Sequence, residues 1–199
     1  MALGVVAAGA PTNAVLIASV AALVAGAMSM AAGEYVSVSS QRDTELADLA
    51  LERRELTAQP ETEQRELAAI YVKRGVPREL AIQVAEALTA SDALAAHARD
   101  ELGLDLTMPA RPVQAAVYSA VSFTVGALLP VVAFLVAPTS ARTLAVVGSA
   151  LLALVILGIA GARAGGAPML RAAVRVGVGG GFAMAITAGV GHLVGGIGL

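Results

Sequence analysis

Cysteine and tryptophan are absent from this 199-residue chain, and aromatic residues make up only 3% of it. The absence of cysteine excludes disulfides, thiolate metal sites and cysteine nucleophiles. Any metal site must therefore use oxygen and nitrogen ligands, with methionine as the only sulfur. Charged residues are also scarce, at 14%, whereas apolar residues reach 57%. This composition is too apolar for an ordinary soluble domain and indicates a membrane protein.

Acidic residues are missing from both ends of the chain. All fifteen lie between Glu34 and Asp105, and nine of the thirteen basic residues lie between Arg42 and Arg111. The other four basic residues are Arg142, Arg163, Arg171 and Arg175. One charged, water-facing segment therefore separates two apolar blocks.

The apolar blocks are long enough to form membrane helices, since about 20 apolar residues cross a hydrocarbon core of about 30 Å. Four segments meet this requirement: residues 14–32, 112–137, 143–162 and 172–199. Residues 1–10 supply only about half the length at about 1.5 Å per residue, and a turn at residues 11–13 follows. We expect a half helix that pairs with the next span. The predicted fold class is an all-α polytopic membrane protein.

The arginines predict the orientation of these helices, because Lys and Arg near helix ends favour the cytoplasmic side. The charged segment and the loop that carries Arg163, Arg171 and Arg175 should both be cytoplasmic. We therefore divide the chain into three parts. These are membrane helices over residues 1–36, a cytoplasmic helical domain over 37–110, and membrane helices over 111–199.

The charged segment has the sequence pattern of a small helical bundle. Residues 36–56 contain neither glycine nor proline, so the second span should continue beyond the membrane as one helix. Pro60 suits the first position of the next helix, and Gly75 should end it. The further predicted boundaries are a helix start at Pro77 and a separate last helix that Ser91 or Asp92 caps and Gly103 closes.

Carboxylates recur in pairs along these predicted helices. Glu52 and Glu55 are three residues apart, as are Glu63 and Glu66, while His97 and Glu101 are four apart. Each spacing places both side chains of a pair on one helix face. Carboxylates from separate helices, together with a histidine, are typical of iron and manganese sites in helical bundles. Neighbouring carboxylates repel each other unless a cation or a proton lies between them. These six residues are the candidate metal ligands.

A solvated helix face is the alternative explanation for the same pattern. Glutamates at this spacing are common on exposed helices. Arg53, Arg54, Arg65 and Arg99 are close enough in sequence to form surface ion pairs with them. Spacing alone leaves both explanations open.

Met30 and Glu34 lie four residues apart near the predicted cytoplasmic end of the second span. A carboxylate at that depth is costly unless it reaches water or lines a polar path, and a thioether is a soft ligand for a transition metal. These properties suit a polar path or a metal contact at that depth. The alternative is that Glu34 only ends the apolar span and Met30 only fills a gap in the core.

Four long stretches resemble the vacuolar iron transporter family, in a bacterial-type member. They are "AGAMSMAAGEYVSVSSQRDTE", "EQRELAAIYVKRGVPRELAIQVAEALTASDALAAHARDELGL", "ARPVQAAVYSAVSFTVGALLPVVAF" and "LRAAVRVGVGGGFAMAIT". The resemblance covers essentially the whole chain. It implies a homodimer with five membrane helices per subunit and a cytoplasmic helical metal-binding domain between the second and third. It also implies exchange of Fe²⁺ or Mn²⁺ for protons, moving the metal out of the cytoplasm.

The resemblance also implies roles for individual residues. Metal ligation falls on Glu52, Glu55, Glu63, Glu66, His97 and Glu101, and the translocation path on Met30 and Glu34. His97 occupies a position where the family has methionine, which keeps a metal-binding side chain but makes it harder and titratable. An aspartate of the family's first helix has no counterpart here, and we hypothesise that the natural start lies upstream of Met1.

From these observations we expect a proton-coupled exporter of ferrous or manganous ions in a bacterial inner (plasma) membrane, with Zn²⁺, Co²⁺ and Ni²⁺ as further candidate ions. We expect no enzymatic activity, no prosthetic group and no nucleic-acid partner. A membrane-anchored metal-buffering protein without transport is the first alternative, because the start of the first helix is missing. A membrane di-iron oxidase is the second, although the sequence lacks the usual Glu-x-x-His pairs.

Overall fold

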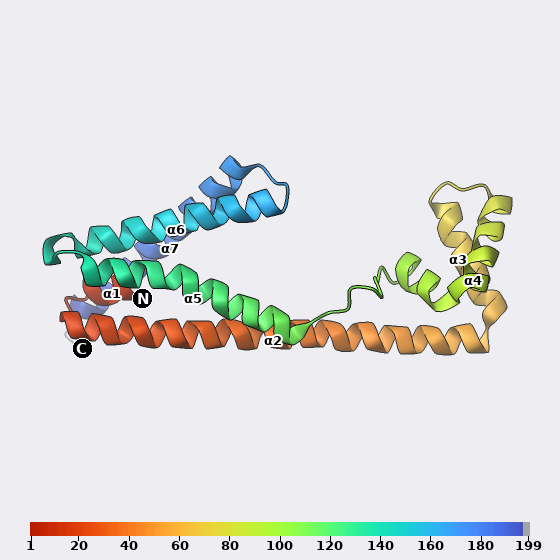
Figure 1. The fold of residues 1–199 in the computed structure, drawn as a ribbon, viewed down its shortest axis with the longest axis horizontal. Coiled ribbons are helices and arrows are strands. Elements are labelled where there is room, and N and C mark those ends of the chain that lie inside the picture. The colour runs from red at the N-terminus through yellow and green to blue at the C-terminus, as the bar shows by residue number, and fades with distance from the viewer. Residues whose placement is uncertain (197–199) are drawn as a thin grey trace. The chain divides into compact units, whose positions relative to one another are not determined.

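The computed structural model of the chain describes residues 1–196, and all the regular structure in that range is helical (Figure 1). The helices are α1 (Ala2–Ala7), α2 (Thr12–Ala58), α3 (Pro60–Lys73), α4 (Arg78–Asp100), α5 (Pro112–Val136), the short 3₁₀ helix η1 (Thr139–Ala141), α6 (Arg142–Ala164) and α7 (Met169–Gly196). This confirms the predicted all-α class. The last three residues of the predicted final span, 197–199, lie outside the described residues.

The chain divides into two compact units. The membrane unit consists of residues 1–33 and the described residues from 116 onward, and the charged unit consists of residues 34–115. Helix α2 contributes to both units. Its 47 residues give a length of about 70 Å at about 1.5 Å per residue, more than twice the thickness of a hydrocarbon core. Only its apolar first part suits a membrane, because charged residues begin at Glu34.

Four helical segments of the described chain are long and apolar enough to cross a membrane: Thr12–Ala58, Pro112–Val136, Thr139–Ala164 and Met169–Gly196. At most 11% of the apolar window in each is buried within the chain. Large side chains such as Ile17, Leu144 and Phe182 remain exposed. An apolar exterior of this extent requires lipid rather than water around it. The chain is therefore an integral membrane protein, and the four predicted full spans are confirmed.

Helix α1 packs mainly against α7, and less extensively against α6. A Cβ atom at Gly191 would overlap the backbone of Gly4, and one at Gly195 would lie 2.7 Å from the Cα atom of Ala8. Glycine at these positions lets the two backbones approach closely, as in many membrane helix pairs. We expected this half helix to pair with the next span. Its closest backbone contacts are instead with α7, because glycines there allow a closer approach, although its side chains also pack against the apolar cluster that includes Val15 of α2.

In the charged unit, α3 and α4 pack around a small apolar core of Leu67, Ala68, Ala85 and Ala96. Pro60 is the first residue of α3, as predicted. Gly75 ends this helix with a positive φ of 93°, and the amide of Val76 donates to the carbonyl of Tyr71 at 3.1 Å. This is a Schellman motif, in which glycine avoids the steric cost that other residues meet at positive φ.

The long helix α4 changes direction at Asp92, whose backbone is extended rather than helical (φ −160°, ψ 95°). The carboxylate of Asp92 accepts a hydrogen bond from the amide of Ala95 at 3.0 Å. This is the geometry of a helix N-cap. Asp92 therefore starts a separate final segment, as the sequence predicted, and that segment carries His97 toward α2 and α3.

Candidate metal centre

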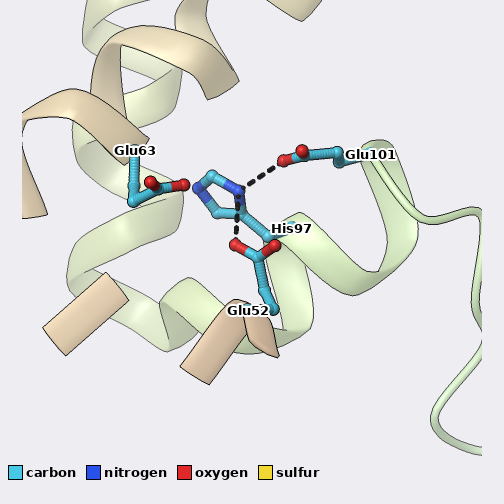
Figure 2. A group of neighbouring side chains, drawn as sticks. All are labelled: Glu52, Glu63, His97 and Glu101. Atoms are coloured by element: carbon cyan, nitrogen blue, oxygen red, sulfur yellow. Dashed lines mark hydrogen bonds and ion pairs between the residues drawn. The ribbon is translucent and has the colours of Figure 1, made fainter. Parts of the chain in front are cut away.

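Four of the six predicted ligands lie together in the charged unit. Glu52 comes from α2, Glu63 from the first turn of α3, His97 from the last segment of α4, and Glu101 directly follows α4. One ligand atom from each of the four lies within 4.8 Å of the others, and their side chains converge from separate helices (Figure 2). We call these four residues the acidic cluster. Because Glu52, Glu63 and the His97–Glu101 pair come from separate parts of the chain, tertiary packing creates the cluster.

The imidazole of His97 is at the centre of the acidic cluster and is completely buried. Its Nδ1 atom lies 2.9 Å from Oε2 of Glu101 and 3.0 Å from Oε1 of Glu52. Its Nε2 atom has no hydrogen-bond partner. Figure 2 shows the carboxylate of Glu63 directed at the Nε2 edge of the ring, opposite Glu52 and Glu101. The Nδ1 atom of the ring therefore has a hydrogen-bond partner, whereas the Nε2 atom has none.

Two of the carboxyl groups are buried as deeply as the core residues. Glu52 and Glu63 are 3% and 6% exposed. Burial raises the pKa of both groups, because it penalises the charged form. Neighbouring carboxylates raise the pKa further, chiefly that of Glu101 for Glu52 and that of Glu66 for Glu63, while His97 acts in the opposite direction. Without a cation or protons, this arrangement is electrostatically costly.

The remaining two predicted ligands, Glu55 and Glu66, lie at the edge of the acidic cluster. Glu55 is half-buried and Glu66 is exposed. Both are close enough to raise the pKa of Glu63 through charge repulsion. Glu55 and Glu66 therefore lie beside the cluster, as their three-residue spacing from Glu52 and Glu63 predicts. Their role as ligands stays a prediction.

Arginines do not neutralise these glutamates. Nε of Arg54 donates to the carbonyl of Ala50 at 3.2 Å, Nε of Arg65 donates to the carbonyl of Glu61 at 3.0 Å, and Arg99 pairs with Asp100 at 2.9 Å. Among residues 1–196, no arginine forms an ion pair with Glu52, Glu55, Glu63 or Glu66. A solvated face with surface ion pairs therefore does not account for the buried members of the cluster.

Asp100 forms a hydrogen-bond network that the sequence did not reveal. Its Oδ2 atom accepts from the hydroxyl of Tyr71 at 2.7 Å and from Nη2 of Arg99 at 2.9 Å, and its Oδ1 atom accepts from Nη1 of Arg74 at 2.8 Å. These bonds, that of Arg99 first, hold the pKa of Asp100 well below its usual range. Because Asp100 precedes Glu101, the network fastens the end of α4 to α3 beside the cluster.

Met30 and Glu34 are one helical turn apart on α2, and both side chains are exposed in the single chain. Neither belongs to the acidic cluster. Their place on one face of the helix follows from its periodicity. Their assignment to a translocation path stays a prediction.

Comparison with known proteins gives an independent indication of the family. The family model described as the VIT family matches residues 1–192. The vacuolar iron transporter of Acanthamoeba castellanii is 49% identical over 180 residues, which are 90% of this chain and 69% of that protein. VIT-like transporter 1b of Glycine max is 35% identical over 184 residues, which are 92% of this chain and 63% of that protein.

A third relative extends the match along nearly the whole chain. Vacuolar iron transporter homolog 1 of Oryza sativa subsp. japonica is 36% identical over 193 residues, which are 96% of this chain and 65% of that protein. The chain thus spans about two thirds of the length of these relatives. Because the family model covers nearly all of its residues, the chain belongs to the VIT family.

Proposed function

We propose that this chain transports divalent iron across a membrane, with manganese as a second cargo. The observation that carries the proposal is the acidic cluster, in which the buried carboxyl groups of Glu52 and Glu63 lie at opposite edges of the buried His97 imidazole. A divalent cation relieves the repulsion that such an arrangement creates. Relatives whose names describe them as iron transporters support iron as the cargo.

The chemistry of the donor set agrees with this choice of ions. Carboxylate oxygens and an imidazole nitrogen bind Fe²⁺ and Mn²⁺, and they also bind Zn²⁺, Co²⁺ and Ni²⁺. All the donors of the acidic cluster are oxygen or nitrogen atoms, from three glutamates and one histidine. We therefore assign the cluster to reversible binding of a cargo ion rather than to catalysis.

We propose that the ion is collected in the cytoplasm by the charged unit, with Glu55 and Glu66 supplementing the acidic cluster. Met30 and Glu34 then line its path into the membrane unit of a homodimer. The ion leaves the cytoplasm across the bacterial plasma membrane in exchange for protons. Antiport is chemically natural here, because a carboxylate binds either a proton or a metal ion and metal binding releases protons.

A transport assay in proteoliposomes tests the role of the carboxylates. Glu52, Glu55, Glu63 and Glu66 are replaced together by alanine, and uptake of Fe²⁺ and Mn²⁺ is measured. The matched control replaces Asp43, Asp48, Glu79 and Glu86, which are exposed and do not belong to the cluster, and so deletes the same charge. We expect uptake to fall about tenfold or more in the first variant only, as for the loss of metal-site residues generally. Equal uptake by the two variants would contradict the proposal.

The same vesicles separate transport from metal buffering. If the chain is an antiporter, the initial rate of uptake should rise with an imposed proton gradient, and the vesicle interior should lose protons as metal enters. A buffering protein would instead bind a fixed number of ions whatever the gradient. Uptake that saturates at the amount of protein present would therefore favour the buffering function.

A further inference from the structure

We propose that three arginines beside the turn between α6 and α7 bind the phosphate group of an anionic phospholipid. Arg163 lies in the last turn of α6, Arg171 lies in the first turn of α7, and Arg175 lies one turn further along α7. We call these three residues the arginine triad. The inference concerns the membrane unit alone and goes beyond the proposed transport of metal ions.

The turn keeps two members of the arginine triad at the same end of a helix pair. Residues 165–168 connect α6 to α7, and the two helices pack against each other (Figure 1). Gly166 has a positive φ of 67°, a conformation in which glycine lets the chain reverse tightly after a helix. Arg163 therefore lies just before the reversal and Arg171 just after it.

The membrane unit offers no acidic residue to neutralise the arginine triad. All fifteen acidic residues of the chain lie between Glu34 and Asp105, which are in the charged unit. The first turn of α7 lacks an acidic residue as well, so nothing local offsets the charge of Arg171. In the part of the chain that the structure describes, no ion pair reaches any of the three arginines, and all three are exposed.

Arg175 lies deeper in the membrane unit than Arg171. A Cβ atom at Gly158 of α6 would lie 3.4 Å from the carbonyl oxygen of Ala172 and from Val176, so this part of α7 lies beside an apolar part of α6. A guanidinium at that depth is costly unless its long side chain reaches the headgroups. Helical side chains lean toward the N-terminus of their helix, and Arg171 lies one turn away in that direction on the same face. The two guanidinium groups should therefore meet at the level of the headgroups.

The chemistry of this site favours a phosphate diester as the ligand. A guanidinium group binds phosphate oxygens through two parallel hydrogen bonds. The turn connects two apolar spans and so lies at a membrane surface, where basic groups between helices bind anionic headgroups. All the charged side chains of the membrane unit are arginines, so an anionic lipid is complementary to it. We infer a phospholipid rather than a soluble phosphate as the occupant.

Native mass spectrometry of the full chain in detergent tests this inference. The protein is titrated with phosphatidylglycerol, which is anionic, and with phosphatidylcholine, which is zwitterionic. Replacement of all three arginines by glutamine should weaken binding of phosphatidylglycerol on the order of 100-fold, because each basic residue near an anionic lipid surface contributes about a factor of five. The matched control replaces Arg42, Lys73 and Arg78 of the charged unit, which are exposed, by glutamine and should bind as the wild type does.

A lysine variant separates a phosphate site from a general attraction of positive charge. Lysine at all three positions keeps the charge, and with it the preference of basic loops for one side of the membrane, but it lacks the planar fork of arginine. We expect this variant to bind phosphatidylglycerol more weakly than the wild type and more tightly than the glutamine variant. Circular dichroism confirms that each variant retains its helix content.

The outcomes either support the lipid site or overturn it. Preference of the wild type for phosphatidylglycerol, with loss in the glutamine variant and partial loss in the lysine variant, supports it. Equal binding of the two lipids, an equal loss in the control, or full binding by the lysine variant would overturn it. Displacement of the lipid by millimolar inorganic phosphate would assign the arginine triad to a soluble anion instead. Each outcome leaves metal transport standing, because the arginine triad is separate from the acidic cluster.

Discussion

The membrane unit and the charged unit bury opposite kinds of side chain. The buried cluster of the membrane unit consists of Val15, Phe134 and Val146, and the hydroxyl of its buried Ser19 is satisfied by the carbonyl of Val15 at 2.6 Å. The charged unit buries Glu52, Glu63 and His97 beside its apolar core. The difference shows that the charged unit gathers three buried ionisable groups in one cluster, whereas the described part of the membrane unit leaves the Nε atom of Arg142 without a hydrogen-bond partner. A cation bound within the cluster would relieve the repulsion between its carboxylates.

The two units also differ in what holds their helices together. In the membrane unit, helices approach closely where a side chain is missing, as at Gly191 of α7 against Gly4 of α1. In the charged unit, polar side chains also reach across the helix interfaces beside the apolar core. Changes in backbone spacing should therefore disturb the first unit most, and changes in charge or metal should disturb the second.

Gly191→Val should have the largest effect. The new side chain would overlap the backbone of Gly4, which cannot move as easily as a side chain, so we expect a loss of roughly 3 kcal/mol in stability. Gly189→Val is the control, because a Cβ atom there meets nothing within 4 Å. Thermal unfolding of both variants in detergent, followed by circular dichroism, measures the difference. Similar melting temperatures would mean that close contact between α1 and α7 does not stabilise the membrane unit.

Metal binding should produce the next largest effect, and only through the charged unit. At a free Co²⁺ concentration of about 100 times the dissociation constant, the folded state should gain about 2.7 kcal/mol. This gain should vanish in Glu63→Leu and should persist in Gly189→Val, which leaves the cluster intact. Melting temperatures with and without Co²⁺ provide the measurement. Stabilisation of Glu63→Leu equal to that of the wild type would place the ion elsewhere.

Asp100→Asn tests the network that fastens α4 to α3. We expect a loss of about 1 kcal/mol, since Arg74 and Arg99 are half-exposed or more and their ion pairs are partly screened by water. The lowered pKa of Asp100 means that its contribution is present above its ordinary pKa of 3.8 and is lost as the pH falls through the folded value. Asp105→Asn is the control, because Asp105 bonds only within its own loop, to Thr107. Equal acid sensitivity of the two variants would contradict this role.

The smallest expected effect is a pH dependence of opposite sign in the metal-free chain. Glu52 and Glu63 have raised pKa values in the folded state, so their contribution to stability is complete below the ordinary value of 4.5. It is lost as the pH rises through the folded values, because burial then opposes ionisation. The melting temperature should fall over this window, and less so in Glu52→Gln. A slope unchanged by this substitution would show that Glu52 does not control it.

Local sequence signals predicted much of the architecture. Pro60, Gly75 and Asp92 mark helix boundaries because each acts through its own backbone or a neighbour within three residues. The four full spans follow from long apolar runs. The contact between α1 and α7 did not follow, because glycine-rich runs permit close approach without specifying the partner. The partner of a half helix depends on how the neighbouring helices are arranged in three dimensions.

The sequence predicted which residues would form the acidic cluster, but it did not predict how their side chains are oriented. Helical spacing and family resemblance identified six candidate ligands, and the structure brings four of them together: Glu52, Glu63, His97 and Glu101. Which edge of the imidazole remains open depends on the rotamer of His97 and on the directions of three helices, and no spacing rule encodes these. The bond between Arg74 and Asp100 was missed for the same reason, since nothing local links residues 26 positions apart.

The uneven exposure of the acidic cluster also has a kinetic consequence. Three of its members are buried, whereas the side chain of Glu101 is 34% exposed. If the cluster binds the cargo ion as proposed, a hydrated ion would meet Glu101 before the three buried members and would exchange its water molecules for protein donors in stages. The exposed carboxylate would then govern the rate of loading, while the buried donors would govern the residence time of the ion. Substitutions at the two places should change the association and dissociation rates separately.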